Sequence, residues 1–240
     1  MTATLDLPQL LAAYAIGAFP MADSRDADSI YWVEPRRRAI LPLDGFHLSR
    51  SLRKTIAGDR FRVTADAAFD RIIALCAEAV ENRPDTWINA TIEEAFRRLH
   101  GLGLAHSIEC WDGERLVGGL YGLALGRAFF GESMVSRAAD ASKVAIAALV
   151  ARLRVGGFTL LDCQFMTDHL ATLGAREIDR RDYMALLGAA LSATGSSAAA
   201  SSSLAGAASA GADFRALDAA AGADGAVPGK VIVQALTQTS

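Results

Sequence analysis

The chain has 240 residues, of which 52% are hydrophobic and 21% are charged. This length allows one large domain or two small ones, and the apolar content excludes a mostly disordered protein. The formal net charge of −3 gives no overall signal for nucleic acid. No apolar run reaches the ~18 residues that would span a membrane. Cys76, Cys110 and Cys163 form neither a disulfide framework nor a metal-binding CxxC motif, so we expect a reduced protein of the cytoplasm.

Residues 1–58 are expected to form a small N-terminal domain. A helix is predicted over 8–16, because Pro8 suits a first helical turn and Gly17 suits a helix end. Two short strands are predicted at 30–33 and 38–41. A second helix follows at 48–56, with Ser49 as its N-terminal cap.

Residues 59–190 are expected to form an α/β (α+β) domain with a mixed central sheet. Helices are predicted where apolar residues recur at helical spacing, at 65–80, 91–102, 141–154, 168–174 and 182–191. Thr91 and Glu94 suggest a capping box at the second of these. Strands are predicted at 61–64, 105–111, 115–122, 123–130 and 158–165, with a hairpin at Asp112-Gly113. The almost continuously apolar strand 158–165 should be central and buried.

The C-terminal part has a different composition. Residues 192–212 are almost entirely Ala, Ser and Gly, so 191–229 is predicted to be a flexible linker. The segment 230–240 regains an apolar pattern typical of a strand, which would add an edge to the sheet. The order of elements before the linker is similar to an acetyltransferase core.

One segment of the chain is strongly basic, although the net charge of the whole chain is slightly negative. Residues 36–62 contain eight basic and two acidic side chains, a net charge of +6, so the remainder of the chain carries −9. Such an asymmetry can attract a polyanion even to an acidic protein. The aromatic rings of Tyr31 and Trp32 beside it are able to stack on bases. The alternative is a solvated face with ordinary salt bridges.

A second candidate is the pair Asp162 and Gln164 on the apolar strand. Alternation places both on one face and Cys163 on the other. A buried carboxylate and carboxamide need partners, which indicates either a structural hydrogen-bond network or a site that handles an amine proton. The expected position of Cys163, opposite the pair, argues against a nucleophilic role.

The third candidate is the run Phe129 to Met134. Here a strand ends in aromatic residues, Gly131 is expected to turn the chain, and Glu132 follows. This pattern fits an apolar pocket with an acidic rim, or a core strand beside an exposed acid. The glycines form no dinucleotide or phosphate loop, and the four histidines have no metal-type spacing. We therefore expect no cofactor and no metal.

Eight segments in order resemble one family, the leucyl/phenylalanyl-tRNA–protein transferases. They fall within residues 7–187 and are 10–23 (LLAAYAIGAFPMAD), 31–54, 86–92 (TWINATI), 106–111, 116–122, 129–143 (FFGESM followed by ASK), 160–165 (LLDCQF) and 173–183. The resemblance implies an acetyltransferase-like (GNAT-type) C-terminal domain beside the small N-terminal one. It implies transfer of Leu, Phe and, less readily, Met from aminoacyl-tRNA to the N-terminal Arg or Lys of a protein, which marks that protein for the N-degron pathway. A monomer without cofactor is expected.

The resemblance also assigns roles to residues of this chain. Gln164 would contact the attacking α-amine, and Asp162 would polarise it or relay its proton. Glu132 would face the amine or the cationic acceptor residue. The remaining roles are a pocket for the donor side chain (Leu120, Phe129, Leu149), a place near the terminal adenosine (Trp87) and binding of tRNA (Arg36, Arg37, Arg38, Arg53, Lys54, Arg62).

Some positions depart from the family pattern. Met21 stands where some members have an aromatic residue, and Leu120 and Leu149 replace bulkier side chains. Two other functions compete with the resemblance. An acyl-CoA N-acetyltransferase would need a pyrophosphate turn, which the run Arg115 to Leu120 approaches without completing. A non-catalytic tRNA-binding protein would explain the basic segment but not the Asp162–Gln164 pair.

Overall fold

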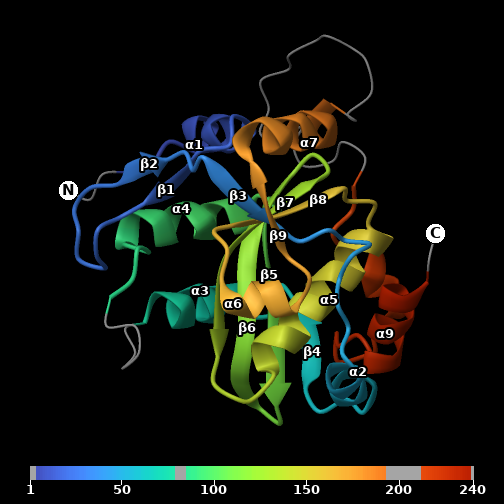
Figure 1. Cartoon of the computed structure of the whole chain (residues 1–240). Helices are drawn as coiled ribbons and strands as arrows, with labels where there is room; N and C mark the ends of the chain where they lie inside the picture. Colours follow the sequence, from blue (N-terminus) through green and yellow to red (C-terminus); the bar gives the residue numbers. More distant parts are fainter. Residues whose placement is uncertain (1–3, 79–84, 193–211, 239–240) are drawn as a thin grey trace.

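The computed structural model describes residues 4–78, 85–192 and 212–238 and is built around one seven-stranded sheet (Figure 1). In spatial order the strands are β4 (Arg62–Ala65), β5 (Ala105–Asp112), β6 (Arg115–Leu125), β7 (Ala128–Ser136), β8 (Leu160–Gln164), β3 (Arg37–Ile40) and β9 (Arg176–Asp179). Among the strands of the described residues, only β7 and β8 pair in parallel. The mixed α/β fold is therefore confirmed, whereas the likeness to acetyltransferases stays a prediction.

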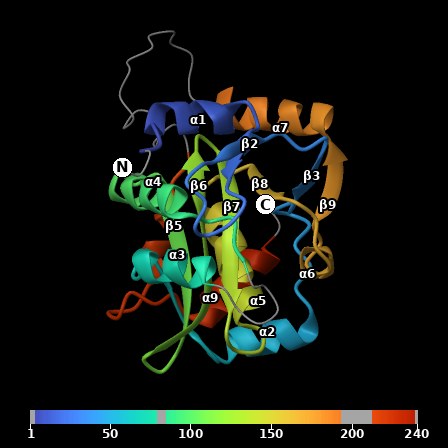
Figure 2. The ribbon, with the colours of Figure 1, turned by 90° about the vertical axis from the view of Figure 1, so that its left-hand side faces the viewer.

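Helices cover both faces of this sheet (Figures 1 and 2). One face carries α3 (Phe69–Ala77) and α4 (Ala90–Gly101), and the other carries α5 (Ala141–Val155), α2 (Arg50–Ala57) and α9 (Gly229–Thr237). At one end of the sheet α1 (Leu7–Ala15) packs beside α7 (Arg180–Ser192). Each face buries its own apolar cluster. Among the described residues, no helix has the length and apolarity needed to cross a membrane.

The sheet splits between its two parallel strands. Pairing of β7 with β8 stops at Phe130 and Asp162, and β7 then continues alone to Ser136. The crossover between these two strands is α5, which lies against β5, β6 and β7. Side chains that follow the last paired residues therefore face a gap in the sheet rather than a neighbouring strand.

Most elements predicted for the N-terminal part are confirmed. Helices α1 and α2 and strands β2 (Tyr31–Val33) and β3 form where expected, and Ser49 caps α2 by accepting a bond from Leu52 N. Strand β1 (Phe19–Met21) pairs with β2 in a separate two-stranded sheet. Strand β3, however, belongs to the main sheet, so the two parts of the chain share it.

Two local predictions are wrong. Helix α4 is capped by Asn89 and not by Thr91, because the Asn89 side chain accepts from Ile92 N at 3.0 Å and the helix begins one residue earlier. Gly131 does not turn the chain, because it lies within β7 opposite Gly122. The turn comes earlier, between Leu125 and Ala128, and residues 123–125 belong to β6. Glu132 consequently lies in the middle of a strand.

The C-terminal prediction is also corrected. The expected strand at 230–240 is the helix α9, whose Ile232 and Val233 are buried. Residues 212–229 are packed rather than loose, with the short helix η1 (Ala216–Ala220) and buried Phe214 and Leu217. The β-branched run favours a strand locally, but contacts with α2 and α5 decide for a helix. The Ala/Ser/Gly-rich residues 193–211 lie outside the described part.

Candidate active site

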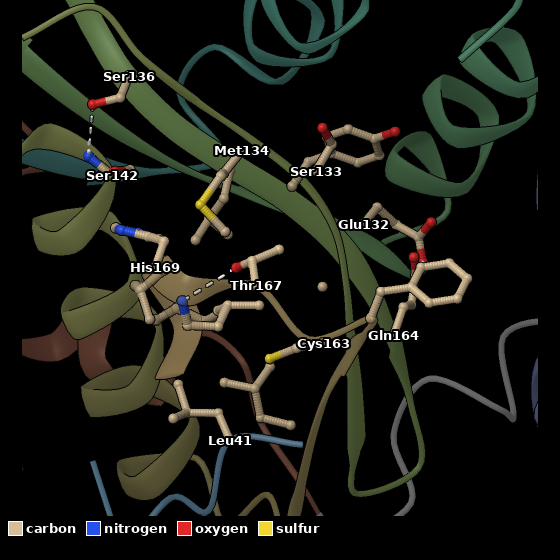
Figure 3. Close-up of a pocket in the computed structure, with 18 of the residues that line it drawn as sticks. Leu41, Glu132, Ser133, Met134, Ser136, Ser142, Cys163, Gln164, Thr167 and His169 are labelled. Atoms are coloured by element: carbon tan, nitrogen blue, oxygen red, sulfur yellow. Dashed lines mark hydrogen bonds between the residues drawn. The ribbon is translucent and has the colours of Figure 1, made fainter. Parts of the chain in front are cut away.

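A pocket of about 520 Å³ opens where β7 and β8 part. Glu132 and Gln164 lie at one end of it in Figure 3, and Ser136 and Ser142 lie at the other. Most of the wall is apolar, and it comes from β6, β7, β8 and α5. The apolar lining residues include Leu41, Leu120, Met134, Ile146, Leu149 and Leu161. The pocket therefore offers an apolar volume with a polar carboxylate–carboxamide end.

A buried ion pair lies behind this polar end. Arg38 donates to both carboxylate oxygens of Asp162, from Nε at 2.9 and 3.0 Å and from Nη2 at 2.7 Å. Tyr183 donates its hydroxyl to Asp162 Oδ2 at 2.8 Å, and Arg38 Nη1 donates to the Gly17 carbonyl at 3.1 Å. Phe19 and Tyr183 face the guanidinium, with ring centroids 4.6 and 4.7 Å from Cζ. Such a bidentate, fully partnered pair is rigid.

This geometry changes two predictions. Arg38 has 1% of its surface exposed, so it does not lie on an outer face that binds tRNA. Asp162 is fully buried and does not line the pocket. Its contacts are therefore with neighbouring protein groups and not with the space of the pocket. The attraction between the two charges in the interior explains why this arginine of the basic segment is drawn inward.

Asp162 instead fixes Gln164, whose backbone adopts a left-handed conformation with φ of 62°. This conformation is uncommon outside glycine, and Asp162 Oδ1 stabilises it by accepting from Gln164 N at 2.8 Å. The alternation of β8 is thereby broken. Both Cys163 and Gln164 line the pocket, contrary to the expectation that they face opposite ways. Burial raises the pKa of the Cys163 thiol, so a thiolate nucleophile is not favoured.

Glu132 is held at the pocket by one of its two carboxylate oxygens. Tyr14 donates its hydroxyl to Oε1 at 2.8 Å, and Gln164 Nε2 donates to the same oxygen at 2.9 Å. Within the described chain, Oε2 is buried and has no hydrogen-bond partner. Burial raises the pKa of Glu132 to about 7, assisted by the charge of Asp162 and opposed by the two hydrogen bonds and by Arg38. The carboxylate is thus poised to change charge near neutral pH.

The other predicted pocket residues divide into two groups. Trp87, Leu120 and Leu149 line the pocket, as Glu132 and Gln164 do. Phe129 does not line it, because its ring packs in the core against Phe214, at a centroid distance of 5.6 Å.

The predicted tRNA-binding residues are spread over distant elements. Arg36 and Arg37 are exposed at the start of β3, where Arg37 pairs with Glu177 and Asp179. Arg53 and Lys54 are exposed on α2, which lies at the opposite end of the molecule from α1 (Figures 1 and 2). Arg62 stacks over Trp111 with its Cζ 5.0 Å from the ring centroid. The segment that is continuous in sequence therefore does not form one continuous patch.

Sequence reasoning missed Tyr14 and Tyr183, the two hydroxyls that anchor the carboxylates. A hydroxyl on the buried face of an amphipathic helix was the available signal, because a buried Tyr needs a partner for its O–H. Tyr14 lies on the buried face of α1 and Tyr183 on that of α7. In the described part of the chain, no group of His, Cys, Asp or Glu is arranged to hold a metal ion.

The pocket can take a ligand with an apolar group, and its carboxylate–carboxamide end can accept hydrogen bonds from a donor such as an amine. Comparison with known families is more specific. The sequence model of leucyl/phenylalanyl-tRNA protein transferase matches residues 40–188, and the model of that family's N-terminal domain matches residues 3–36.

Individual relatives support the same family. A leucyl/phenylalanyl-tRNA–protein transferase of Rhizorhabdus wittichii is 61% identical over 98% of this chain and 99% of its own length. One of Phenylobacterium zucineum is 52% identical over 99% of this chain and 100% of its own, and one of Zymomonas mobilis is 64% identical over 80% of this chain and 72% of its own. The chain belongs to the leucyl/phenylalanyl-tRNA protein transferase family. This confirms the predicted class of enzyme, an aminoacyltransferase.

Proposed function

We propose that the chain transfers Leu, Phe and, less readily, Met from aminoacyl-tRNA to the N-terminal Arg or Lys of acceptor proteins. The new peptide bond would mark these proteins for degradation by the N-degron pathway in the cytoplasm. The observation that carries the proposal is the pocket at the split of the sheet, in which an apolar wall ends at Glu132 and Gln164. Family membership narrows this chemistry to aminoacyl transfer from tRNA.

The apolar wall supports the choice of donor. Leu120, Ile146 and Leu149 would contact the side chain of the donor amino acid. Such contacts favour apolar side chains that are unbranched at Cβ, such as Leu and Phe, over charged ones, because a charged side chain would lose its hydration there. For substrates that differ by one methylene, such contacts change the free energy of discrimination by only ~1–3 kcal/mol, so some transfer of Met is expected. Trp87 at the pocket is available to stack on the terminal adenosine.

The carboxamide of Gln164 would meet the attacking amine. Its Nε2 already donates to Glu132, so its carbonyl oxygen is the atom left to accept from the acceptor's α-amine. Asp162 serves as a positioning residue that holds the backbone of Gln164. The neutral amine attacks the ester carbonyl, the amide C–N bond forms, the ester C–O bond breaks, and the proton leaves with the tRNA hydroxyl. No cofactor enters this balance.

The exposed cations would hold the tRNA without reading its sequence. The candidates are the exposed Arg36, Arg37, Arg53 and Lys54 and the half-buried Arg62, and Arg38 is removed from the set by its burial. Contacts of this kind bind phosphates and fix the orientation of the acceptor stem. We propose that the protein acts as a monomer.

The test is transfer of labelled Leu. The purified protein is incubated with tRNA charged with labelled Leu and with a peptide that begins with Arg. We expect label in the peptide, little label in a peptide of the same sequence that begins with Asp, and a loss of at least tenfold in rate for Gln164→Ala. Folded wild-type protein that moves no label to the Arg peptide would contradict the proposal.

A further inference from the structure

Glu132 lines the pocket and has one carboxylate oxygen without a partner among the described residues. Its Oε1 is occupied by Tyr14 and Gln164, at 2.8 and 2.9 Å. Its Oε2 is buried without a partner in the described residues, on a side chain that is 7% exposed and lines the pocket. A buried carboxylate oxygen without a partner is costly, so it indicates a ligand that supplies a hydrogen-bond donor.

The hydrogen-bond donor that suits a carboxylate best is a small cation, because charge strengthens the bond. Glu132 lies at one end of a mostly apolar pocket, so a ligand with an ammonium group close to an apolar side chain fits it. An α-amino acid esterified through its carboxyl group has this pattern, because its amine and its side chain are attached to the same carbon. Under the proposed function, two amines approach this end of the pocket. One belongs to the amino acid of the donor, and the other to the N-terminus of the acceptor.

The chemistry of the reaction assigns Glu132 to the donor. A carboxylate that binds the acceptor's amine would stabilise its protonated form, which cannot attack. The donor's amine takes no part in bond formation, so it can remain protonated throughout. We propose that Glu132 Oε2 binds the free α-ammonium group of the donor aminoacyl ester and thereby excludes donors whose amine is acylated or missing. This inference rests on the proposed function and names a specificity determinant within it.

The position of Glu132 depends on the N-terminal part of the chain. Tyr14 belongs to α1, whereas Glu132 belongs to β7 of the main sheet. The Tyr14 hydroxyl and Gln164 Nε2 together restrict rotation of the carboxylate and thereby fix the position of Oε2. Tyr14 is therefore a positioning residue for recognition of the donor's amine.

Binding without transfer separates this inference from the proposed function. Two stable probes are compared in the absence of acceptor and tRNA: adenosine that carries leucine in a 3′-amide, and the same compound with 4-methylpentanoic acid, which lacks only the amine. Calorimetry at pH 7.5 measures both affinities. We expect wild-type protein to bind the leucyl probe roughly 10- to 100-fold more tightly, as a hydrogen-bonded charge requires.

Glu132→Gln should bind the two probes with equal affinity, because the amide places a donor where the carboxylate oxygen was. Glu114→Gln is the matched control, since Glu114 is exposed in the β5–β6 turn, and it should keep the wild-type preference. Equal binding of both probes by wild-type protein, or a preference that survives in Glu132→Gln, would overturn the inference. Binding with preference but no transfer of Leu would reject the proposed function alone.

A second measurement needs no variant. Protonation of Glu132 should abolish the preference for the leucyl probe, so the affinity ratio should fall as the pH is lowered from about 7.5 to about 5.5, a range below the usual pKa of ~7.7 of an α-amine, in which the probe keeps its ammonium group. The charged or titratable groups around Glu132 are Tyr14 on α1, Asp162 on β8 and Arg38 on β3. Burial lowers the pKa of Arg38, but the hydrogen bonds and charge of Asp162 raise it above its ordinary value, so Arg38 keeps its charge over this range. A ratio that does not change with pH would contradict the assignment.

Discussion

Two buried carboxylates lie side by side in the site, and their surroundings differ in charge. Asp162 is paired with Arg38 and accepts from Tyr183 and from a backbone amide. Glu132 accepts only neutral hydrogen bonds, from Tyr14 and Gln164. Asp162 therefore maintains the structure of the strand end, while Glu132 keeps a binding capacity that the fold does not use. Such unused capacity lowers stability and is typical of functional sites.

The first prediction concerns the free energy of unfolding of Glu132→Gln. Burial raises the pKa of Glu132 to about 7, from 4.5. The folded state thus binds this proton more tightly than the unfolded state, so the stability that it contributes is complete below pH 4.5 and lost as the pH rises through about 7. The loss is on the order of 3 kcal/mol, at ~1.4 kcal/mol per pKa unit.

Because glutamine does not ionise, Glu132→Gln should gain stability relative to wild type as the pH rises. Urea unfolding at pH 5, 6, 7 and 8 measures this difference. We expect a difference in unfolding free energy that is small at pH 5 and favours the variant at pH 8. Glu114→Gln is the control for the loss of one negative charge at an exposed position. A constant difference for Glu132→Gln would mean that this carboxylate is solvated in the folded protein.

At the scale of elements, the sequence was sufficient wherever local signals and packing agree. Helix α5 and strand β8 could be predicted, because both are nearly continuous apolar runs that lie against other elements. The candidate pair of Asp162 and Gln164 could be found for the same reason, as polar residues within an apolar strand. The geometry of this pair could not be predicted from the sequence. The left-handed backbone at Gln164 depends on the hydrogen bond that its N–H donates to Asp162, and the position of Asp162 depends in turn on the distant Arg38.

Helix α9 and the segment before it could not be predicted from local pattern. They are fixed by contacts with elements far away in the sequence. Gly229 N donates to Asp59 Oδ1 at 2.7 Å, Arg152 Nη1 donates to the Phe214 carbonyl at 2.9 Å, and Phe214 stacks on His106 at a centroid distance of 4.0 Å. Helix α5, which supplies pocket residues, is thus held on its other side by the C-terminal segment.

The second prediction tests the contact between α9 and α2. A Cβ added at Gly229 would lie 1.8 Å from the Ile56 carbonyl oxygen, so Gly229→Ala must displace α9 from α2. We expect a loss of about 1–3 kcal/mol in the free energy of unfolding, as for other overpacked sites. Gly188→Ala is the matched control, because Gly188 is exposed within α7 with nothing within 4 Å of its added Cβ. That variant should gain roughly 0.5–1 kcal/mol.

Both changes are measured by urea unfolding at one pH. The two substitutions are chemically identical, so opposite signs would show that the close approach of backbone, and not the added methyl group, decides the outcome. Equal stability of Gly229→Ala and wild type would mean that α9 does not pack against α2 in solution.

At the scale of the whole molecule, the net charge of −3 conceals a division of charge. The segment 36–62 carries +6, but folding distributes it. Arg38 enters the interior, Arg37 is neutralised by two acids beside β3, and Arg53 and Lys54 remain exposed on α2. The positive field that could act on tRNA is therefore smaller than the sequence indicates. Helix α2 is the element on which we test whether this field binds tRNA.

The third prediction follows from this distribution. Replacing Arg53 and Lys54 by Glu should weaken tRNA binding and flatten its dependence on salt, because fewer counterions are released from the phosphates. If both side chains contact phosphates, the slope of log affinity against log salt should fall by about 2, at ~0.9 for each contact. Titration of tRNA at several salt concentrations measures the slope.

The matched control exchanges the two residues, Arg53→Lys with Lys54→Arg, and preserves the charge. It should keep the slope of wild type, because nonspecific phosphate contacts depend on charge more than on geometry. Loss of affinity with an unchanged slope in the Glu variant would indicate a disturbed helix rather than lost phosphate contacts. Unchanged affinity and slope would place the tRNA on another face, and the exposed arginines beside β3 would then be the next cations to test. Because α2 also packs against α9, thermal unfolding of each variant accompanies the titration, and only variants with the wild-type midpoint report on the charge alone.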